Sequence, residues 1–169
     1  MDDRAVVARQ LGRTPRAFRR VAVRCPWGRP AVVEQEPYDD RGEPFPTTHW
    51  LTCRHLVATL ARLEAAGGVE RWSEAAAADP ELRASLERAT AAQREDRRRL
   101  ASGRTGVDGG ASLDLGIGGS RNPAQLKCLH AHAAFALAHA GYELGERIVA
   151  EAEPLWPTDR CCTDEDGAA

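Results

Sequence analysis

The densest group of reactive side chains lies in the stretch GIGGSRNPAQLKCLHAH, residues 116–132. Cys128 and His132 are four residues apart, so they would share one face of a helix. A thiol and an imidazole placed in this way can form a thiolate–imidazole pair or ligate one metal ion. His130 would point to nearly the opposite side, where it can donate or accept a proton. We therefore treat Cys128, His130 and His132 as candidate catalytic residues of a small hydrolase-like or transferase-like enzyme.

A zinc site is the second chemistry that these side chains allow. One helix supplies two ligands at most, so further ligands must come from another part of the fold. The metal-ligating set that we predict is Cys53, Cys128 and His132, with Cys25, His49 and His55 as additional candidates. The alternative is that the cysteines only pack in the core and the histidines only form hydrogen bonds.

The glycine-rich part of the same stretch predicts an anion site. A loop that runs into a helix N-terminus exposes backbone N–H groups, and the helix dipole favours negative charge there. Asn122 followed by Pro123 is a good start for such a helix. We expect a small anionic or phosphorylated ligand to be bound by Gly118, Gly119, Arg121 and Lys127. The sequence has neither a GK[ST] phosphate loop nor a GxGxxG dinucleotide motif, so a glycine loop that only caps a helix is the alternative.

A second constrained segment, residues 44–53, reads PFPTTHWLTC. Its two prolines restrict the backbone, and its phenylalanine and tryptophan offer apolar surface. Packed against the domain, this segment would orient Thr47, Thr48 and His49 toward a cleft, so we add these three residues to the predicted ligand-binding set. A loop that only closes the core is the alternative.

Lysine usage singles out one position. The chain has 169 residues, and of its 23 basic residues 22 are arginine and only Lys127 is lysine. A bias toward amino acids with GC-rich codons explains most of the arginine. The single lysine nevertheless falls directly before Cys128. Because lysine and arginine are not interchangeable where a compact ammonium is required, we predict that Lys127→Arg impairs function without unfolding the protein.

Composition and charge narrow the class of protein. With 43% hydrophobic and 28% charged residues, the sequence is typical of a globular domain. No secretory signal or membrane-spanning run is recognisable, so we expect a cytoplasmic protein without membrane contact. Five cysteines with no CxxC pair do not indicate a disulfide framework. Basic residues gather in residues 1–30 and acidic residues in 151–169, and nucleic-acid binding through an arginine-rich face is a third hypothesis, ranked behind the other two.

A helix-rich α+β fold must position these segments. Short valine-containing runs at residues 18–24 and 31–36 predict a small β-hairpin, which a strand near residues 48–51 extends into a short antiparallel sheet. Apolar spacing and capping residues predict about five helices packed against it, with Thr52 as one N-cap. The helical segments are expected at residues 4–11, 52–66, 69–78, 80–100, 123–140 and 142–153. We expect a single domain, residues 1–153, followed by an acidic and flexible C-terminal tail, residues 154–169.

Four segments together resemble a known family. QLGRTPR, RCPWGRPAVVEQEP, GEPFPTTHWLTC and GIGGSRNPAQLKCLHAH occur in the same order in the bacterial family called domain of unknown function 501, and the resemblance covers residues 5–153. It implies no particular activity, substrate or cofactor. The positions that match its motifs are Cys25, Pro46, Thr47, Cys53, Gly118, Gly119, Lys127, Cys128, His130 and His132.

The leading function hypothesis is therefore a cytoplasmic binding or regulatory protein. Its pocket would be formed by residues 116–122, Lys127, His130 and the FPTTHW loop, with a small anion or phosphorylated molecule as ligand. The alternative is a small Cys/His or metal-dependent enzyme, hydrolase-like or transferase-like, that uses Cys128 and His132.

Overall fold

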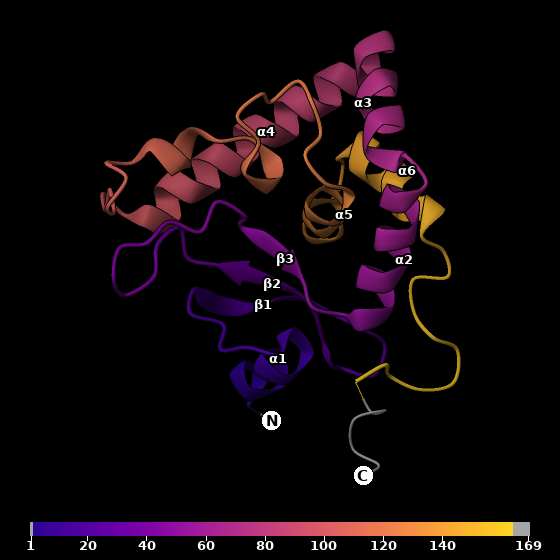
Figure 1. Cartoon of the computed structure of the whole chain (residues 1–169), viewed down its shortest axis with the longest axis horizontal. Helices are drawn as coiled ribbons and strands as arrows, with labels where there is room; N and C mark the ends of the chain where they lie inside the picture. Colours follow the sequence, from indigo (N-terminus) through magenta and orange to yellow (C-terminus); the bar gives the residue numbers. More distant parts are fainter. Residues whose placement is uncertain (1, 164–169) are drawn as a thin grey trace.

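The computed structural model describes residues 2–163, and residues 1 and 164–169 lie outside that description. The described residues form the expected α+β fold, a three-stranded antiparallel sheet surrounded by six α-helices (Figure 1). The elements in chain order are α1 (Asp3–Leu11), β1 (Phe18–Arg24), β2 (Pro30–Gln35), β3 (His49–Leu51), α2 (Arg54–Ala65), α3 (Gly68–Ala78), α4 (Pro80–Ala101), the 3₁₀ turns η1 (Ala111–Asp114) and η2 (Ile117–Gly119), α5 (Leu129–Ala138) and α6 (Glu143–Glu151).

The central strand is β2, which pairs antiparallel with β1 on one side and with β3 on the other. Every residue of β2 is buried. Both faces of this strand are therefore covered, which explains its nearly continuous apolar run at Ala31, Val32 and Val33. Figure 1 shows α1 beside β1 and α5 beside β3. Through β3, the sheet reaches the helix that carries the KCLHAH motif.

The arginines near the N-terminus are matched by acidic side chains. Glu34 of β2 forms ion pairs with both Arg19 and Arg20 of β1. Arg24 pairs with Asp3 of α1 at 2.7 Å. Exposed pairs of this kind contribute at most about 1 kcal/mol each. Their main effect is to neutralise much of the predicted basic face.

The helices α2 and α4 begin by different means. Asp79 caps α4 by accepting a hydrogen bond from Glu81 N at 2.9 Å, with Pro80 in the first turn as predicted. The N-cap of α2 is Cys53 instead of Thr52, whose buried hydroxyl has no partner among residues 2–163. None of the helices in this part of the chain is long and apolar enough to cross a membrane.

The helix expected over residues 123–140 begins later than predicted. α5 starts at Leu129, and Cys128 is its extended N-cap. Asn122 does accept a hydrogen bond from Ala124 N at 3.2 Å, but this bond closes only a turn. Residues 123–128 stay irregular because Leu126 is buried in the core and its backbone N–H donates to Ser73 Oγ at 3.2 Å. Tertiary contacts outweigh a good local start signal.

Residues 154–163, called here the C-terminal segment, lie within the expected acidic tail and pack on the domain. His55 Nε2 lies 2.9 Å from the Pro154 carbonyl, and Gln10 donates to Thr163 Oγ1 at 3.0 Å. Leu155 and Trp156 pack against the core. In Figure 1 the segment leaves α6 and passes outside α2 toward the end of the molecule that holds α1. The last part of the predicted tail, residues 164–169, lies outside the described residues.

Candidate functional site

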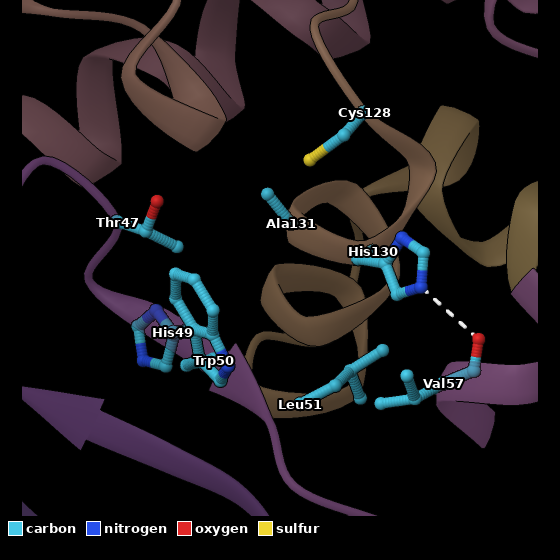
Figure 2. A pocket seen from close by; sticks show the side chains of 8 residues that line it. All are labelled: Thr47, His49, Trp50, Leu51, Val57, Cys128, His130 and Ala131. Carbon is cyan, nitrogen blue, oxygen red and sulfur yellow. Dashed lines mark hydrogen bonds between the residues drawn. The ribbon is translucent and has the colours of Figure 1, made fainter. Parts of the chain in front are cut away.

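A pocket of about 330 Å³ lies between β3 and the start of α5. The lining residues, all drawn in Figure 2, are Thr47, His49, Trp50, Leu51, Val57, Cys128, His130 and Ala131. The pocket therefore combines the PFPTTHWLTC segment with the KCLHAH motif. A concave, largely apolar lining with a few polar groups is the usual form of a small-molecule site.

Gly118 and Gly119 pack behind this pocket without lining it. Both have positive φ, 71° and 77°, which favours glycine. A Cβ added to Gly118 would lie 3.0 Å from Ala131 Cβ, and one added to Gly119 would lie 2.9 Å from Pro46 Cβ. The Gly119 N–H donates to the Gly116 carbonyl at 3.0 Å and is not free for an anion. Their observed role is to let the loop approach the pocket wall closely.

Lys127 lies next to this glycine loop and directly before the lining residue Cys128. A Cβ on Gly119 would be 3.8 Å from Lys127 Nζ as well as close to Pro46, the residue before Thr47. Lys127 is exposed, and within residues 2–163 its ammonium has no ion-pair or hydrogen-bond partner. Arg121 is also exposed but does not line the pocket. Neither of the two predicted cationic residues lines the pocket, but Lys127 directly precedes the lining residue Cys128.

The N-terminus of α5 is already occupied by a carboxylate of the chain itself. Glu64, in the last turn of α2, accepts a hydrogen bond from Leu129 N at 2.6 Å. The same oxygen lies 3.0 Å from His130 Nδ1, while His130 Nε2 lies 3.1 Å from the Val57 carbonyl (Figure 2). Glu64 therefore occupies the position at the helix N-terminus where the predicted anion would bind. Since both partners of His130 are acceptors, only an imidazolium protonated at both nitrogens donates to both.

Cys128 and His132 do not form the predicted pair. Cys128 precedes the helix, and Figure 2 shows its sulfur pointing toward the space between Thr47 and Ala131. Burial raises the pKa of the Cys128 thiol, the opposite of what an activated nucleophile needs. His132 is fully buried, its Nδ1 lies 2.7 Å from Tyr142 Oη, and burial lowers its pKa to about 3. Within the described part of the chain no hydrogen bond joins the two side chains.

The neighbouring residues Thr48 and His49 have separate environments. His49 lines the pocket, and burial, followed by the nearby His139, lowers its pKa to about 4. Its Nδ1 is buried and has no partner in residues 2–163. Thr48 turns away from the pocket, and its hydroxyl accepts a hydrogen bond from Arg97 at 3.3 Å. Of the three predicted ligand-binding residues in this loop, Thr47 and His49 face the pocket and Thr48 does not.

The predicted zinc ligands are not brought together. Within residues 2–163 no group of three or more histidine, cysteine or acidic side chains is placed to hold a metal ion. Cys53 instead lies beside Cys162, with 3.6 Å between the two sulfurs. Cys53 caps α2, Cys128 precedes α5 and His132 is buried against Tyr142, so the three predicted ligands face different surroundings.

Arg97 is a positioning residue that the sequence reasoning missed. It is completely buried, although it belongs to the run of three arginines at residues 97–99. Its guanidinium donates to the Phe45 carbonyl at 2.8 Å and to the Ser112 carbonyl at 3.2 Å, as well as to Thr48 Oγ1. Arg97 thus ties the segment before β3 to the 3₁₀ turn η1, which contains Ser112. The only available signal was helical spacing, since Arg97 follows Thr90 and Gln93 on the buried side of α4.

Comparison with known proteins settles the family. A family model described as "Protein of unknown function (DUF501)" matches residues 21–150. The chain belongs to the DUF501 family. Both segments that line the pocket lie inside the DUF501 match, whereas α1 and the C-terminal segment lie outside it. The search of curated proteins and the search of solved structures each found no match.

The buried histidines make the stability of this DUF501 protein sensitive to acid. The pKa of His132 is about 3 in the native state, against a usual value near 6.5 in an unfolded chain. Between these values the unfolded chain binds a proton that the native protein does not, so stability falls as the pH drops below about 6.5. We expect His132 to contribute about 1.4 kcal/mol per pH unit to the free energy of unfolding over this range. Urea unfolding at a series of pH values should show a shallower dependence in His132→Leu, and equal slopes would contradict this assignment.

Proposed function

We propose that the pocket between β3 and α5 binds a small molecule with an aromatic or other flat apolar part and one anionic group. The observation that carries the proposal is the position of Lys127. The only lysine of the chain directly precedes the lining residue Cys128, its Nζ lies near Gly119, and it has no ion-pair or hydrogen-bond partner among the described residues. An unpaired ammonium next to an apolar pocket is suited to a ligand that brings its own negative charge.

The lining supports an apolar body for this ligand. Trp50 is 38% exposed, high for a large aromatic side chain, and Leu51, Val57 and Ala131 add aliphatic surface. The guanidinium carbon of Arg13 lies 5.8 Å from the Trp50 ring centroid and helps to hold the ring in place. A volume of about 330 Å³ is at the small end of ligand pockets, which suits a single ring with a short substituent.

The surroundings of Cys128, His130 and His132 support ligand binding better than they support catalysis. The Cys128 thiol has a raised pKa, and both nitrogens of His130 are engaged by Glu64 and Val57. His132 is sequestered against Tyr142. Cys128 and His130 line the pocket and His132 does not, and none of the three is poised as a nucleophile with its own base.

The test is calorimetric titration of the whole protein with phenyl phosphate, benzoate and uncharged benzyl alcohol. We expect the two anions to bind and the alcohol to bind much more weakly. Lys127→Ala should weaken anion binding by about tenfold, the usual value of one charge-assisted contact. Lys127→Arg keeps the charge but not the compact ammonium, and should weaken binding by a smaller factor of about three.

Two further variants locate the site. Trp50→Ala should weaken the binding of all three compounds, because it removes the aromatic wall of the pocket. Arg147→Ala removes an exposed cation of α6 that pairs with Glu143, and should leave binding unchanged. Absence of binding by every compound, or equal affinity for the alcohol and the anions, would refute the proposed ligand class.

A further inference from the structure

Four of the five cysteines meet at one place, away from the pocket described above. Cys25 lies where β1 ends, Cys53 caps α2, and Cys161 and Cys162 belong to the C-terminal segment. All four line the same small enclosed space. The fifth, Cys128, lines the ligand pocket instead. The convergence brings together residues from three distant parts of the chain.

Within this group the thiols are arranged as two pairs. Cys25 and Cys161 have their sulfurs 3.8 Å apart, and Cys53 and Cys162 have theirs 3.6 Å apart. The adjacent cysteines of the C-terminal segment therefore point to different partners. Because the described residues include no set of three or more ligands placed for a metal, the geometry favours two pairs over one tetrahedral site.

Other contacts hold the C-terminal segment in this register. Gln10 Nε2 donates to the Pro30 carbonyl at 2.8 Å and to Thr163 Oγ1 at 3.0 Å, next to the cysteines. At the start of the segment, His55 contacts the Pro154 carbonyl. Cys25, Cys53 and Cys161 are each less than 10% exposed, whereas Cys162 is half-buried. The pairs are thus preorganised, and Cys162 is the sulfur that a reagent reaches first.

We propose that these four cysteines form an oxidisable clasp, in which a Cys25–Cys161 and a Cys53–Cys162 disulfide fasten the C-terminal segment to the domain. The bonds would join residues 136 and 109 positions apart, so they would close very long loops. Disulfides that close long loops restrict the unfolded chain most strongly. The clasp would convert a segment held by noncovalent contacts into one held covalently.

The oxidant is a low-molecular-weight disulfide such as oxidised glutathione. A protein thiolate attacks one glutathione sulfur, which breaks the glutathione S–S bond, forms a mixed disulfide and releases one glutathione thiol. The paired protein thiolate then attacks the protein sulfur of the mixed disulfide and releases the second glutathione thiol. Each protein pair gives up two electrons and two protons, and one glutathione disulfide becomes two thiols. Burial raises the pKa of Cys53 to about 12, so the second exchange is slow.

The experiment treats the reduced full-length protein with excess oxidised glutathione, alkylates the remaining thiols and measures the intact mass. We expect two internal disulfides and alkylation only at Cys128. Cys161→Ser should retain only the Cys53–Cys162 bond, and Cys162→Ser only the Cys25–Cys161 bond. Cys128→Ser is the matched control and should form both. The oxidised wild-type protein should melt roughly 10 °C higher than the reduced protein.

Three results would overturn the proposal. Stable glutathione adducts without internal bonds would show that the pairs cannot close. A bond between Cys161 and Cys162 would show that the pairing is different. Retention of about one equivalent of zinc by the purified protein, lost in Cys161→Ser and Cys162→Ser, would make the cluster a metal site. The two serine variants change only the end of the chain, so the core should fold in both.

Discussion

Replacing Arg97 with alanine is expected to lower the free energy of unfolding by about 3 kcal/mol, a large fraction of the stability of a domain of this size. The substitution leaves the carbonyls of Phe45 and Ser112 and the hydroxyl of Thr48 without their donor in a buried place. It also leaves a cavity where the side chain packed. Burial lowers the pKa of Arg97 and thus opposes its charge, so relief of that cost offsets part of the loss.

The adjacent Arg98 provides the matched control. It is exposed and pairs with Asp114 on the surface, so Arg98→Ala should change stability by no more than about 0.5 kcal/mol. Urea unfolding of both variants measures the difference. Arg97→Lys should fall between them, because one ammonium cannot reach all three acceptors in the planar geometry of a guanidinium. Equal stability of the two alanine variants would show that Arg97 does not tie the two loops together.

Gly119→Ala should destabilise the protein by about 2 kcal/mol and also weaken ligand binding. An alanine in the left-handed conformation costs about 1 kcal/mol on its own. In addition its Cβ would lie 2.9 Å from Pro46 Cβ, so either the loop or Pro46 must move. Because Pro46 precedes Thr47, that movement would distort the pocket edge. Unfolding by urea and titration with phenyl phosphate measure the two effects.

Gly109→Ala is a control that separates the backbone strain of a positive φ from the steric contact with Pro46. Gly109 also has positive φ, 64°, but a Cβ there would meet nothing within 4 Å. We expect this control to lose only the strain energy of about 1 kcal/mol and to bind phenyl phosphate normally. If both glycine variants behave alike, the close approach of the glycine-rich loop to Pro46 has no energetic consequence.

Local signals were sufficient for most of the fold. Asp79 and Pro80 predict the start of α4, and Gly12 predicts the end of α1, because caps and left-handed termini depend on residues close in sequence. The valine runs of the hairpin likewise predict β1 and β2 in the observed pairing. The pocket beside β3 is lined by residues of the PFPTTHWLTC segment and of the KCLHAH motif, whereas the glycine-rich residues 116–122 and Lys127, which the hypothesis also placed there, do not line it.

The errors have a common physical cause, which is contact between distant residues. Asn122 carries a strong cap signal, yet α5 starts at Leu129 because Glu64 supplies the cap from another helix. Arg97 belongs to a charged run, yet it is buried because two loops present acceptors to it. Glu64 is far in sequence from Leu129, and the acceptors of Arg97 are outside its own helix. The direction of Thr48, away from the pocket, follows from the same buried arginine.

The hydrogen bond between Gln10 and Thr163 has a topological consequence. It joins the last turn of α1 to the last described residue, so both ends of the described chain lie on the same side of the molecule (Figure 1). A chain whose ends meet can in principle be circularly permuted, since a short linker can replace the gap between them. The exposed glycines around position 109 offer a natural place to open the backbone. In such a permutant the halves of the pocket would exchange their order along the chain, while every element kept its place in space.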